Sequence, residues 1–375
     1  MKAKNVVYNS KAIRVADQLA EDVRQGKFGS GILLPTDTIL ARQYKVTRET
    51  IRKSLALVSQ NQELVKLPQG GCFIRHEGSG HHKKPQKTLS IGVVWATIPS
   101  GHEMEICKGI ERYVQENDGL QLNIFLPARG HEEAIQRLTQ IEDCAWDGIL
   151  VYPYVSEQYT TAIRDLAGAG FPIVCVDRRL HGVEVSSVEV YNASGMFQAT
   201  SYLIDKFQRP AYILSGKLEH SAQIDRYTGY RQAMGDAGYE QLIPAYTVES
   251  TISETDPHYW PVEEKVRPGF LLAEEFLAKV TSPASVVCSH DYIARGLYEA
   301  AAKRGRTIGK DDLAVVGFDD LPMARLMKPE LTTVRQPRHQ LGYESARLLH
   351  RLMAGREKSP QHIYLPVELI VRDSA

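Results

Sequence analysis

The sequence predicts a small winged helix-turn-helix domain (α+β) at the N-terminus, followed by a larger α/β region of two lobes with parallel, doubly wound sheets. Three observations support this prediction. Two short helical patterns almost meet near residue 46, and a Gly-rich turn signal follows them at residues 68–71. Beyond residue 88, short apolar runs alternate with helical stretches, which is typical of parallel sheets covered by helices on both faces.

The first predicted helix covers residues 10–25, and the next begins after a capping residue. Thr36 is suited to cap a helix over residues 37–44, because its hydroxyl can accept a free backbone N–H, and Asp37 is favoured near the positive helix end. One face of the first predicted helix is apolar. This face contains Ile13, Ala16, Leu19, Ala20 and Val23.

A third helix follows almost at once, with Thr47 as its predicted cap. Its buried face is marked by Ile51, Leu55 and Val58, which recur at helical spacing. Arg48 and Arg52 are four residues apart and so project together from another face. Such a helix suits the major groove of DNA, where a guanidinium can bond guanine O6 and N7 together; an ordinary solvated helix with surface arginines is the alternative.

Two short apolar runs, at residues 64–67 and 72–75, complete the N-terminal domain. They flank Pro68-Gln69-Gly70-Gly71, a strong turn signal, and are therefore predicted to form a hairpin. Helices followed by a hairpin in this order are typical of a winged helix. The predicted domain ends at residue 75, and residues 76–88, rich in Gly, Lys and His, are predicted to be a linker.

Residues 31–75 resemble the GntR-type DNA-binding domain. The resemblance lies in the LPTD start, the VTRETIR helix and the Gly-rich wing at matching intervals. It implies that residues of the helix-turn-helix face double-stranded DNA and that Gln69 and Gly70 stand at the wing tip. The implied helix-turn-helix residues are Thr36, Thr47, Arg48, Thr50, Arg52 and Lys53. Thr38 and Gln69 stand where many relatives carry basic or histidine residues, so half-site sequence should not be copied from relatives.

Charge and composition agree with a DNA-binding domain joined to a globular body. The first 88 residues contain sixteen Lys and Arg against seven Asp and Glu, a net charge of +9 in a chain whose total is zero. Five cysteines are scattered without metal-type spacing, so we expect buried reduced thiols and neither a metal nor a cofactor. No signal peptide or membrane-length apolar run is present, which predicts a cytoplasmic protein without membrane contact.

Residues 89–375 resemble the sugar-binding sensor domain of the lac-repressor family, which is itself similar to periplasmic binding proteins. The matching segments include DGILVYP, VDRRL, RYTGY, HDYIARG and VVGFDD, in family order. The resemblance implies one effector-binding and dimerisation domain of two lobes. The first lobe is expected over about residues 89–190 and 331–359 and the second over about 191–330 and 360–375, with crossings near Val190, Leu331 and Ser359.

The predicted effector site lies in the cleft between these lobes, where parallel strands end. Arg226 and Asp319 match the family's hydroxyl-binding arginine and acid, and Asp177 would approach from the facing lobe. His290 replaces the amide that relatives usually carry. Trp95 and Tyr152 are candidate stacking platforms for a sugar ring, although both could equally be core aromatics. Residues 248–268, which include Trp260, are consistent with a lid over the cleft and equally with a surface loop.

The sequence therefore predicts a homodimeric transcriptional regulator, a repressor of carbohydrate-utilisation genes whose DNA binding is controlled by a small sugar. The combination is similar to the arabinose repressors. One alternative is a regulator that responds to a nucleoside or purine. A weaker alternative of another class is a sugar-binding enzyme, in which Asp319 and Asp320 would be acid–base carboxylates or His290 and Asp291 would form part of a dyad.

Overall fold

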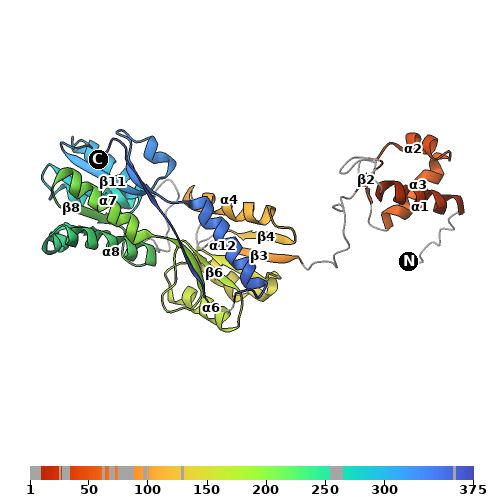
Figure 1. Ribbon diagram of the computed structural model, residues 1–375, viewed down its shortest axis with the longest axis horizontal. Helices are drawn as coiled ribbons and strands as arrows, with labels where there is room; N and C mark the ends of the chain where they lie inside the picture. The colour runs from red at the N-terminus through yellow and green to blue at the C-terminus, as the bar shows by residue number, and fades with distance from the viewer. Residues whose placement is uncertain are drawn as a thin grey trace. The chain divides into compact units, whose positions relative to one another are not determined.

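The computed structural model describes residues 10–24, 27, 34–60, 64–66, 72–74, 88–95, 99, 101–127, 131–253, 265–357 and 360–375. The chain divides into two compact units, residues 1–85 and 86–375 (Figure 1). We call them the head and the body and describe each by itself. The predicted linker at 76–88 lies outside the described residues except for its last residue, Thr88.

The head is a winged helix-turn-helix, as the sequence predicts. Helices α1 (Ser10–Arg24), α2 (Asp37–Gln43) and α3 (Arg48–Gln60) precede an antiparallel hairpin of β1 (Leu64–Lys66) and β2 (Cys72–Ile74). The predicted apolar face of α3 is buried against α1 and α2, because Ile51, Leu55 and Val58 join one core with Leu19 and Leu40. Because this face of α3 is buried, the opposite face of the helix is exposed to solvent.

Hydrogen bonds at the start and middle of α3 set its position in the head. The hydroxyl of Thr47 accepts the Thr50 backbone N–H at 3.2 Å, which confirms the predicted cap. Thr36 occupies the N-cap position of α2, but its side chain makes no capping hydrogen bond. The buried Ser54 hydroxyl donates to the carbonyl of Ala12 at 2.8 Å and so ties α3 to α1.

The body contains two six-stranded sheets, and we name the lobes by them. Lobe one has the strand order β13-β7-β6-β5-β3-β4, with all neighbours parallel. Helices α4 and α12 cover one face and α5 and α6 cover the other. Its elements are β3 (Leu89–Val94), α4 (Gly101–Gln115), β4 (Leu120–Phe125), α5 (His131–Thr139), η1 (Ile141–Cys144), β5 (Gly148–Val151), α6 (Glu157–Gly168), β6 (Ile173–Val176), β7 (Ser186–Val190), α12 (Arg338–Met353) and β13 (His362–Leu365).

Lobe two has the strand order β14-β12-β11-β10-β8-β9, parallel except for the antiparallel edge strand β14. Helices α7 and α8 cover one face and α10 and α11 the other. Its elements are α7 (Asn192–Phe207), β8 (Ala211–Ser215), α8 (Ser221–Asp236), η2 (Glu240–Leu242), α9 (Ile243–Tyr246), β9 (Thr247–Glu249), α10 (Arg267–Leu277), β10 (Ala284–Cys288), α11 (Asp291–Lys303), β11 (Leu313–Asp319), η4 (Pro322–Arg325), β12 (Thr332–Arg335) and β14 (Glu368–Ile370).

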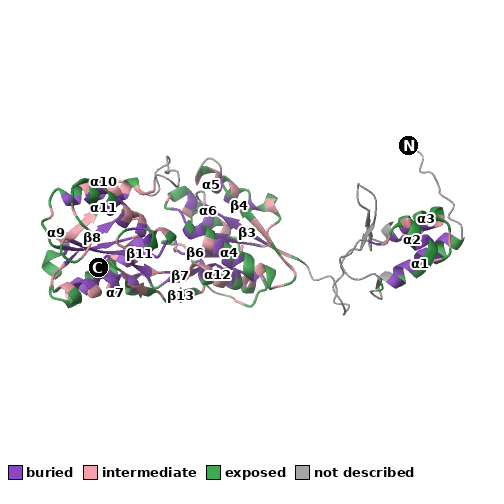
Figure 2. Cartoon of the chain, turned by 90° about the horizontal axis from the view of Figure 1, so that it is seen from above, coloured by how far each residue is buried: buried purple, intermediate pink, exposed green. Residues whose placement is uncertain are grey.

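The two lobes therefore have the predicted doubly wound α/β architecture. Figure 2 shows the central strands mostly buried and the outer helix surfaces exposed. Two strands, β7 and β9, were not predicted. Strand β7 has the sequence SSVEV, whose polar residues hide the apolar run expected of a buried strand, yet all five residues are buried.

Two of the three predicted crossings between lobes are misplaced. The first falls between β7 and α7, as predicted near Val190. The second was predicted near Leu331, but β12 pairs with β11 in lobe two, so the chain crosses at 336–337. The third was predicted near Ser359, but β13 pairs with β7 in lobe one, so the crossing lies at 366–367. The positions of both crossings follow from strand pairing, which cannot be read from the sequence pattern.

The cysteines of the body are free thiols, and three of these four are buried. Cys107, Cys175 and Cys288 are buried free thiols, and Cys144 is a half-buried one. Burial raises the pKa of the Cys107 thiol to about 11 and that of Cys175 to about 12, so both stay protonated at neutral pH. Within the described parts of the chain, the helices are too short or too polar to cross a bilayer.

Candidate functional site

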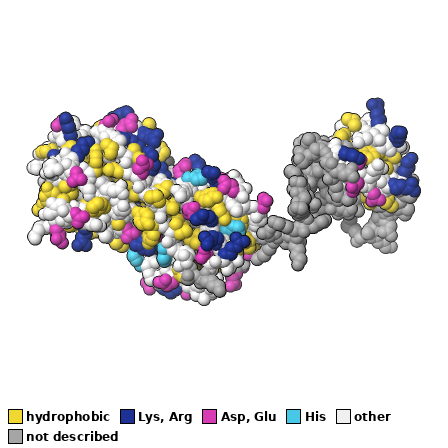
Figure 3. All heavy atoms as spheres, in the orientation of Figure 1, with side chains coloured by type: hydrophobic (Ala, Val, Ile, Leu, Met, Phe, Trp, Pro, Cys, Tyr) yellow, Lys and Arg dark blue, Asp and Glu magenta, His cyan; other side chains and the backbone are white. Residues whose placement is uncertain are grey.

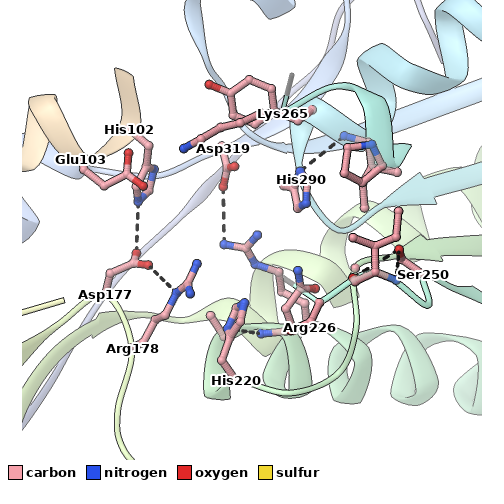
Figure 4. Close-up of a pocket in the computed structure, with 18 of the residues that line it drawn as sticks. His102, Glu103, Asp177, Arg178, His220, Arg226, Ser250, Lys265, His290 and Asp319 are labelled. Carbon is pink, nitrogen blue, oxygen red and sulfur yellow. Dashed lines mark hydrogen bonds and ion pairs between the residues drawn. The ribbon is translucent and has the colours of Figure 1, made fainter. Parts of the chain in front are cut away.

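A cavity of about 120 Å³ lies between the two lobes of the body (Figure 4). Its walls come from residues that follow strands or begin helices, because the carboxyl ends of the parallel strands in both sheets face it. The lining residues that carry polar or aromatic groups are His102, Glu103, Tyr152, Asp177, Arg178, His220, Gln223, Arg226, Ser250, Ser253, Lys265, His290, Tyr292 and Asp319.

Five of the six predicted effector residues line this cavity: Tyr152, Asp177, Arg226, His290 and Asp319. They come from both lobes, as a site between lobes requires. Trp95 is not among the lining residues. It is only 2% exposed and lies in the core of lobe one. Contact of any of these side chains with an effector remains a prediction.

Arg226 and Asp319 form the charged centre of the cavity in lobe two. The Arg226 guanidinium donates to Asn192 Oδ1 at 2.9 Å, to the Ser289 carbonyl at 2.6 Å and to Asp319 Oδ1 at 3.4 Å. It also lies 3.9 Å from the centroid of the Phe318 ring. These contacts hold the guanidinium flat against the lobe and fix the direction of its remaining N–H groups.

Asp177 is the matching carboxylate of lobe one. It lies 3.4 Å from His102 Nε2 and 3.7 Å from Arg178 Nε, and it accepts the Tyr152 hydroxyl at 3.2 Å. Burial raises the pKa of this carboxyl, but the charges of His102, Arg178 and Arg226 outweigh burial and hold the pKa well below its usual range. Asp177 is therefore ionised at neutral pH.

His102 shows the opposite shift for the same reason. Burial lowers its pKa, but the charge and hydrogen bond of Asp177 more than compensate, so the net pKa is raised above the ordinary value of 6.5. His102 Nε2 and the Asp177 carboxylate thus face each other in the wall of the cavity. His102 was not predicted as a site residue, because nothing in its segment indicates that the first turn of α4 faces the cleft.

Of the two aromatic residues predicted as stacking platforms, Tyr152 lines the cavity and Trp95 packs in the core of lobe one. The Arg178 guanidinium lies over the Tyr152 ring, 4.7 Å from its centroid, and the Trp95 ring packs against Tyr152 at 5.3 Å between centroids. Tyr152 is therefore enclosed by these two side chains, and its hydroxyl rather than its face is turned to Asp177. Trp95 is therefore a core aromatic, whereas stacking of a sugar ring on Tyr152 stays a prediction.

His220 and His290 cap the two lobe-two helices that begin at the cavity. The Nδ1 atom of His220 accepts the Gln223 backbone N–H at the start of α8, and that of His290 accepts the Ile293 backbone N–H at the start of α11, both at 3.4 Å. Each ring thereby satisfies one free N–H of its helix. His220 was missed in the sequence, although it directly precedes the segment from Ser221 that carries Arg226.

Two acidic residues that line the cavity, and the neighbour of one of them, have left-handed backbone conformations. The φ angles are +69° at Asp177, +117° at Asp319 and +51° at Asp320. Residues with side chains rarely adopt such angles, which cost about 1–3 kcal/mol each and tend to occur at functional sites. Asp177 directly follows β6 and Asp319 is the last residue of β11, and both line the cavity.

The two residue pairs considered for catalysis are His290 with Asp291 and Asp319 with Asp320. Within each pair, the two side chains bind different partners. Asp291 accepts the Leu321 backbone N–H at 2.8 Å and the Thr333 hydroxyl at 2.7 Å, while the neighbouring His290 caps its helix. Asp320 pairs with Arg335 at 2.7 Å and with Arg372 at 2.5 Å. The carboxylates of Asp319 and Asp320 thus contact different partners on different sides of the loop.

The described ends of the 248–268 insertion reach the cavity. Ser250, Ile252 and Ser253 on one side, and Lys265 and Pro268 on the other, line its wall. Residues 254–264, including Trp260, lie outside the described residues.

The head presents basic side chains on its described surface (Figure 3). Arg48 and Lys53 are exposed on α3, and Lys53 pairs with Glu49 at 2.9 Å. Thr36 and Thr47 are exposed and Thr50 is half-buried. The wing-tip residues Gln69 and Gly70 lie outside the described residues. The remaining exposed basic residues of the described head are Lys11, Arg14, Lys27, Arg42, Lys45 and Arg52.

Arg52 has a partner that the sequence analysis did not foresee. Its Nε lies 2.8 Å from Asp37 Oδ2 at the start of α2, and the Arg52 side chain is still 66% exposed. A surface ion pair of this kind contributes little stability, about 0–1 kcal/mol. Arg52 therefore remains available to another acceptor.

Comparisons with known proteins find a matching family model in each of the two units. Residues 11–74 match the bacterial regulatory proteins of the gntR family, and residues 201–375 match the periplasmic binding protein-like domain. The chain thus combines a GntR-type helix-turn-helix domain with a periplasmic binding protein-like domain.

Similar proteins match between about three quarters and nearly all of the chain. The arabinose metabolism transcriptional repressor of Geobacillus stearothermophilus is 26% identical over 376 aligned positions, which cover 97% of each chain. The HTH-type transcriptional repressor PurR of Histophilus somni is 26% identical over 293 positions, covering 78% of this chain and 83% of that repressor. The crystal structure of transcription regulator CcpA of Lactococcus lactis has a TM-score of 0.66 at 24% identity, covering 77% of this chain and 99% of that one.

Proposed function

We propose that this chain is a transcriptional repressor of carbohydrate-utilisation genes whose DNA binding is controlled by a small sugar bound between the lobes of the body. The observation that supports this most directly is the presence, in one chain, of a winged helix-turn-helix with exposed arginines and a polar cavity enclosed by two lobes. A full-length relative with the same span is a repressor of arabinose metabolism. The protein would act in the cytoplasm as a homodimer.

The head would bind operator DNA through the exposed face of α3. Arg48 and Arg52 would bond the major-groove edges of guanines, and Lys53 with the threonines Thr36, Thr47 and Thr50 would contact the backbone. Gln69 and Gly70 of the wing would approach the minor groove. Two heads in a homodimer would bind an inverted repeat, because half-site spacing mirrors the two-fold symmetry of the protein.

The cavity suits a small polyhydroxylated molecule. Arg226, Asp319 and Asp177 offer several fixed donors and acceptors in a space well below the 300–1,000 Å³ typical of ligand pockets. Ionised side chains that are already held in place lose little freedom when they bind hydroxyl groups. The chemistry therefore favours a monosaccharide held by polar contacts.

Effector binding would act on contacts that join the lobes. Next to Asp177, the Arg179 guanidinium donates to Asp225 of α8 at 2.8 Å and its backbone N–H donates to the Ser221 hydroxyl at 2.9 Å. Next to the crossing at 336–337, the Gln336 amide donates to Asp319 Oδ1 at 2.6 Å. A ligand that engages Asp177 and Asp319 would thus shift both links, and lobe rotation would change the separation of the heads in a dimer.

The proposal is tested by selecting operator DNA from a random duplex library with the full-length chain and measuring its affinity by fluorescence anisotropy. We expect an inverted repeat to be enriched and its binding to weaken steeply with salt, because phosphate neutralisation dominates affinity. Selection of no sequence, or equal affinity for the selected and a scrambled duplex, would refute a sequence-specific regulator.

A further inference from the structure

The two arginines on the exposed face of α3 differ in how they are held. Arg52 Nε donates to Asp37 Oδ2 at 2.8 Å, whereas Arg48 forms no hydrogen bond or ion pair with the residues that the structure describes. Asp37 is the first residue of α2 and Arg52 lies in the second turn of α3, so the pair joins the two helices of the helix-turn-helix. One predicted base-reading arginine is therefore supported by a neighbouring helix, and the other is not.

The hydrogen bond to Asp37 orients the whole guanidinium of Arg52. The guanidinium is planar and carries its N–H donors in a rigid fork. Fixing the Nε–H group therefore also fixes the direction of the N–H groups on the two terminal nitrogens. The Arg52 side chain is 66% exposed, and its Nη atoms make no hydrogen bond within the described part of the chain. These terminal donors are thus held in place and open to solvent.

A guanidinium held in this way suits one base edge in the major groove. Guanine presents O6 and N7 there, and the planar fork of an arginine can bond both atoms together. An arginine that is free in solution must lose side-chain freedom to form this pair, and that loss reduces affinity. Asp37 has already removed part of this freedom from Arg52, whereas Arg48 has no such support.

The charge of Asp37 acts on every duplex alike. A carboxylate on a surface that faces DNA repels the phosphates and weakens binding that does not depend on sequence. The ordering of Arg52, in contrast, favours only a duplex that places a guanine opposite it. Both effects raise the ratio of specific to non-specific affinity. The pair adds little to the stability of the head, because both side chains are partly exposed.

We infer that Asp37 is a positioning residue that sets the specificity of operator recognition: it holds Arg52 so that the terminal N–H groups of the guanidinium meet guanine O6 and N7. Asp37 acts through Arg52 and touches no base itself. This role rests on the proposed function, because it requires α3 to enter the major groove of operator DNA.

Single-base substitutions of the selected operator test this role on the full-length chain. Discrimination at a base pair is the ratio of the affinities for the selected and the substituted duplex, measured by fluorescence anisotropy. Arg48→Ala and Arg52→Ala first identify the base pair at which each arginine provides discrimination. We then expect Asp37→Asn to lower discrimination at the Arg52 base pair by about two- to tenfold, the range for ordering one long side chain, and to leave the Arg48 base pair unchanged.

A double-mutant cycle shows whether Asp37 acts through Arg52. In the Arg52→Ala background, Asp37→Asn should lower discrimination no further, because the guanidinium that it positions is missing. Asp37→Glu keeps the carboxylate and should retain most of the discrimination. Thermal unfolding of each variant without DNA reports the separate effect of a negative charge in the first turn of α2, which changes stability but not discrimination between base pairs.

Glu49→Gln is the matched control for the loss of charge. Glu49 lies in the first turn of α3 and pairs with Lys53 at 2.9 Å. Its replacement removes one negative charge from the same helix-turn-helix but leaves the pair of Asp37 and Arg52 intact. We expect Glu49→Gln to bind the selected and a scrambled duplex more tightly by the same factor, with discrimination at each base pair unchanged.

Three results would overturn the role of Asp37. One is discrimination at the Arg52 base pair that is unchanged or increased in Asp37→Asn, and another is an equal fall in discrimination with and without Arg52. The third is Arg52→Ala discriminating at every base pair as the wild type does. Each of these would leave the proposed function standing, because the operator is still bound sequence-specifically; selection of no sequence would refute the function itself.

Discussion

At the scale of single residues, Arg226 has both a structural and a binding role. Three of its hydrogen bonds go to Asn192, Ser289 and Asp319, and the last of these is itself nearly buried. Removal of a buried cation leaves its partner carboxylate without compensation, which is strongly destabilising in proteins. The same guanidinium is the centre of the proposed sugar site.

Arg226→Ala is therefore expected to abolish sugar binding and to lower the stability of the body by about 3–5 kcal/mol. Arg226→Lys keeps the positive charge and should lose sugar binding with a smaller loss of stability. Calorimetric titration and thermal unfolding measure the two effects. Arg231→Ala, on the exposed side of the same helix, is the control. A normal sugar response in Arg226→Ala would remove Arg226 from the site.

The His102–Asp177 pair makes stability depend on pH. Because the pKa of His102 is raised on folding, its contribution is fully present below the ordinary histidine pKa of 6.5 and is lost as the pH rises through the higher folded value. Asp177 remains ionised over this range, since its pKa is lowered.

We expect the melting temperature of the wild-type protein to fall as the pH rises above the ordinary histidine pKa of about 6.5, with a smaller fall in His102→Asn. Thermal unfolding at a series of pH values measures the difference, and His131→Asn on α5 of the same lobe, outside the cavity, is the control. Identical pH profiles for wild type and His102→Asn would show that the pair does not titrate as described.

Individual site residues could be predicted to different extents. Asp177 and Asp319 were found because they directly follow apolar runs, and strand ends face the cleft in a doubly wound sheet. Trp95 follows a strand as well, but its ring packs behind Tyr152 rather than into the cavity. Rotamers and neighbouring side chains decide this, and neither is visible in the sequence.

At the scale of elements, α3 separates the requirements of folding from those of DNA binding. Its buried face contributes Ile51 to the head core, while Arg48 on the other face is exposed. Substitutions on the two faces should therefore have different effects on the same measurement.

Arg48→Ala should cost about 1–3 kcal/mol of operator binding without changing the unfolding of the head, because it removes a base contact only. Ile51→Ala should destabilise the head by about 2–5 kcal/mol through the cavity it leaves. Anisotropy on the selected operator and scanning calorimetry distinguish the two. Operator affinity that is unchanged by Arg48→Ala would defeat the assignment of α3 as the recognition helix.

The loop after β6 is a second element with a specific task. Arg179 lies in this loop and joins lobe one to α8 of lobe two through Asp225, and it also neutralises the fully buried Glu189 of β7 at 2.8 Å. Burial raises the pKa of Glu189 even with this partner beside it.

Asp225→Asn should weaken lobe closure while Glu189 keeps its partner. We expect lower sugar affinity with nearly unchanged thermal stability, since the Asp225 side chain is partly exposed and such a pair contributes about 0–1 kcal/mol. Calorimetric titration measures the affinity, and Asp236→Asn at the far end of α8 is the control. Equal sugar affinity in wild type and Asp225→Asn would show that this contact does not accompany closure.

Most elements were predictable because apolar periodicity marks them, and the exceptions have a physical reason. Strand β7 contains Glu189 in a fully buried position, where Arg179, ten residues earlier, and the Ser187 hydroxyl both donate to its carboxylate. Strand β12 reads as a strand in sequence, but its place beside β11 depends on pairing across the sheet. Pattern therefore predicts that an element exists more readily than it predicts the lobe to which the element belongs.

At the scale of the whole molecule, one chain contains two compact units. The head supplies sequence recognition, the body supplies a ligand site enclosed by two lobes, and the crossings at 336–337 and 366–367 connect those lobes. A ligand changes DNA affinity only if it binds two arrangements of the body unequally. Coupling of this kind is typically 1–3 kcal/mol, or about 5–150-fold in affinity.

The most direct test is the affinity of the full-length protein for its selected operator. It is measured by anisotropy with and without saturating concentrations of monosaccharides and sugar phosphates, each tested separately. We predict that at least one sugar changes this affinity by about fivefold or more in the wild type and leaves it unchanged in Arg226→Lys. The same affinity with every sugar, or a change of equal size in Arg226→Lys, would contradict control of DNA binding from the cavity between the lobes.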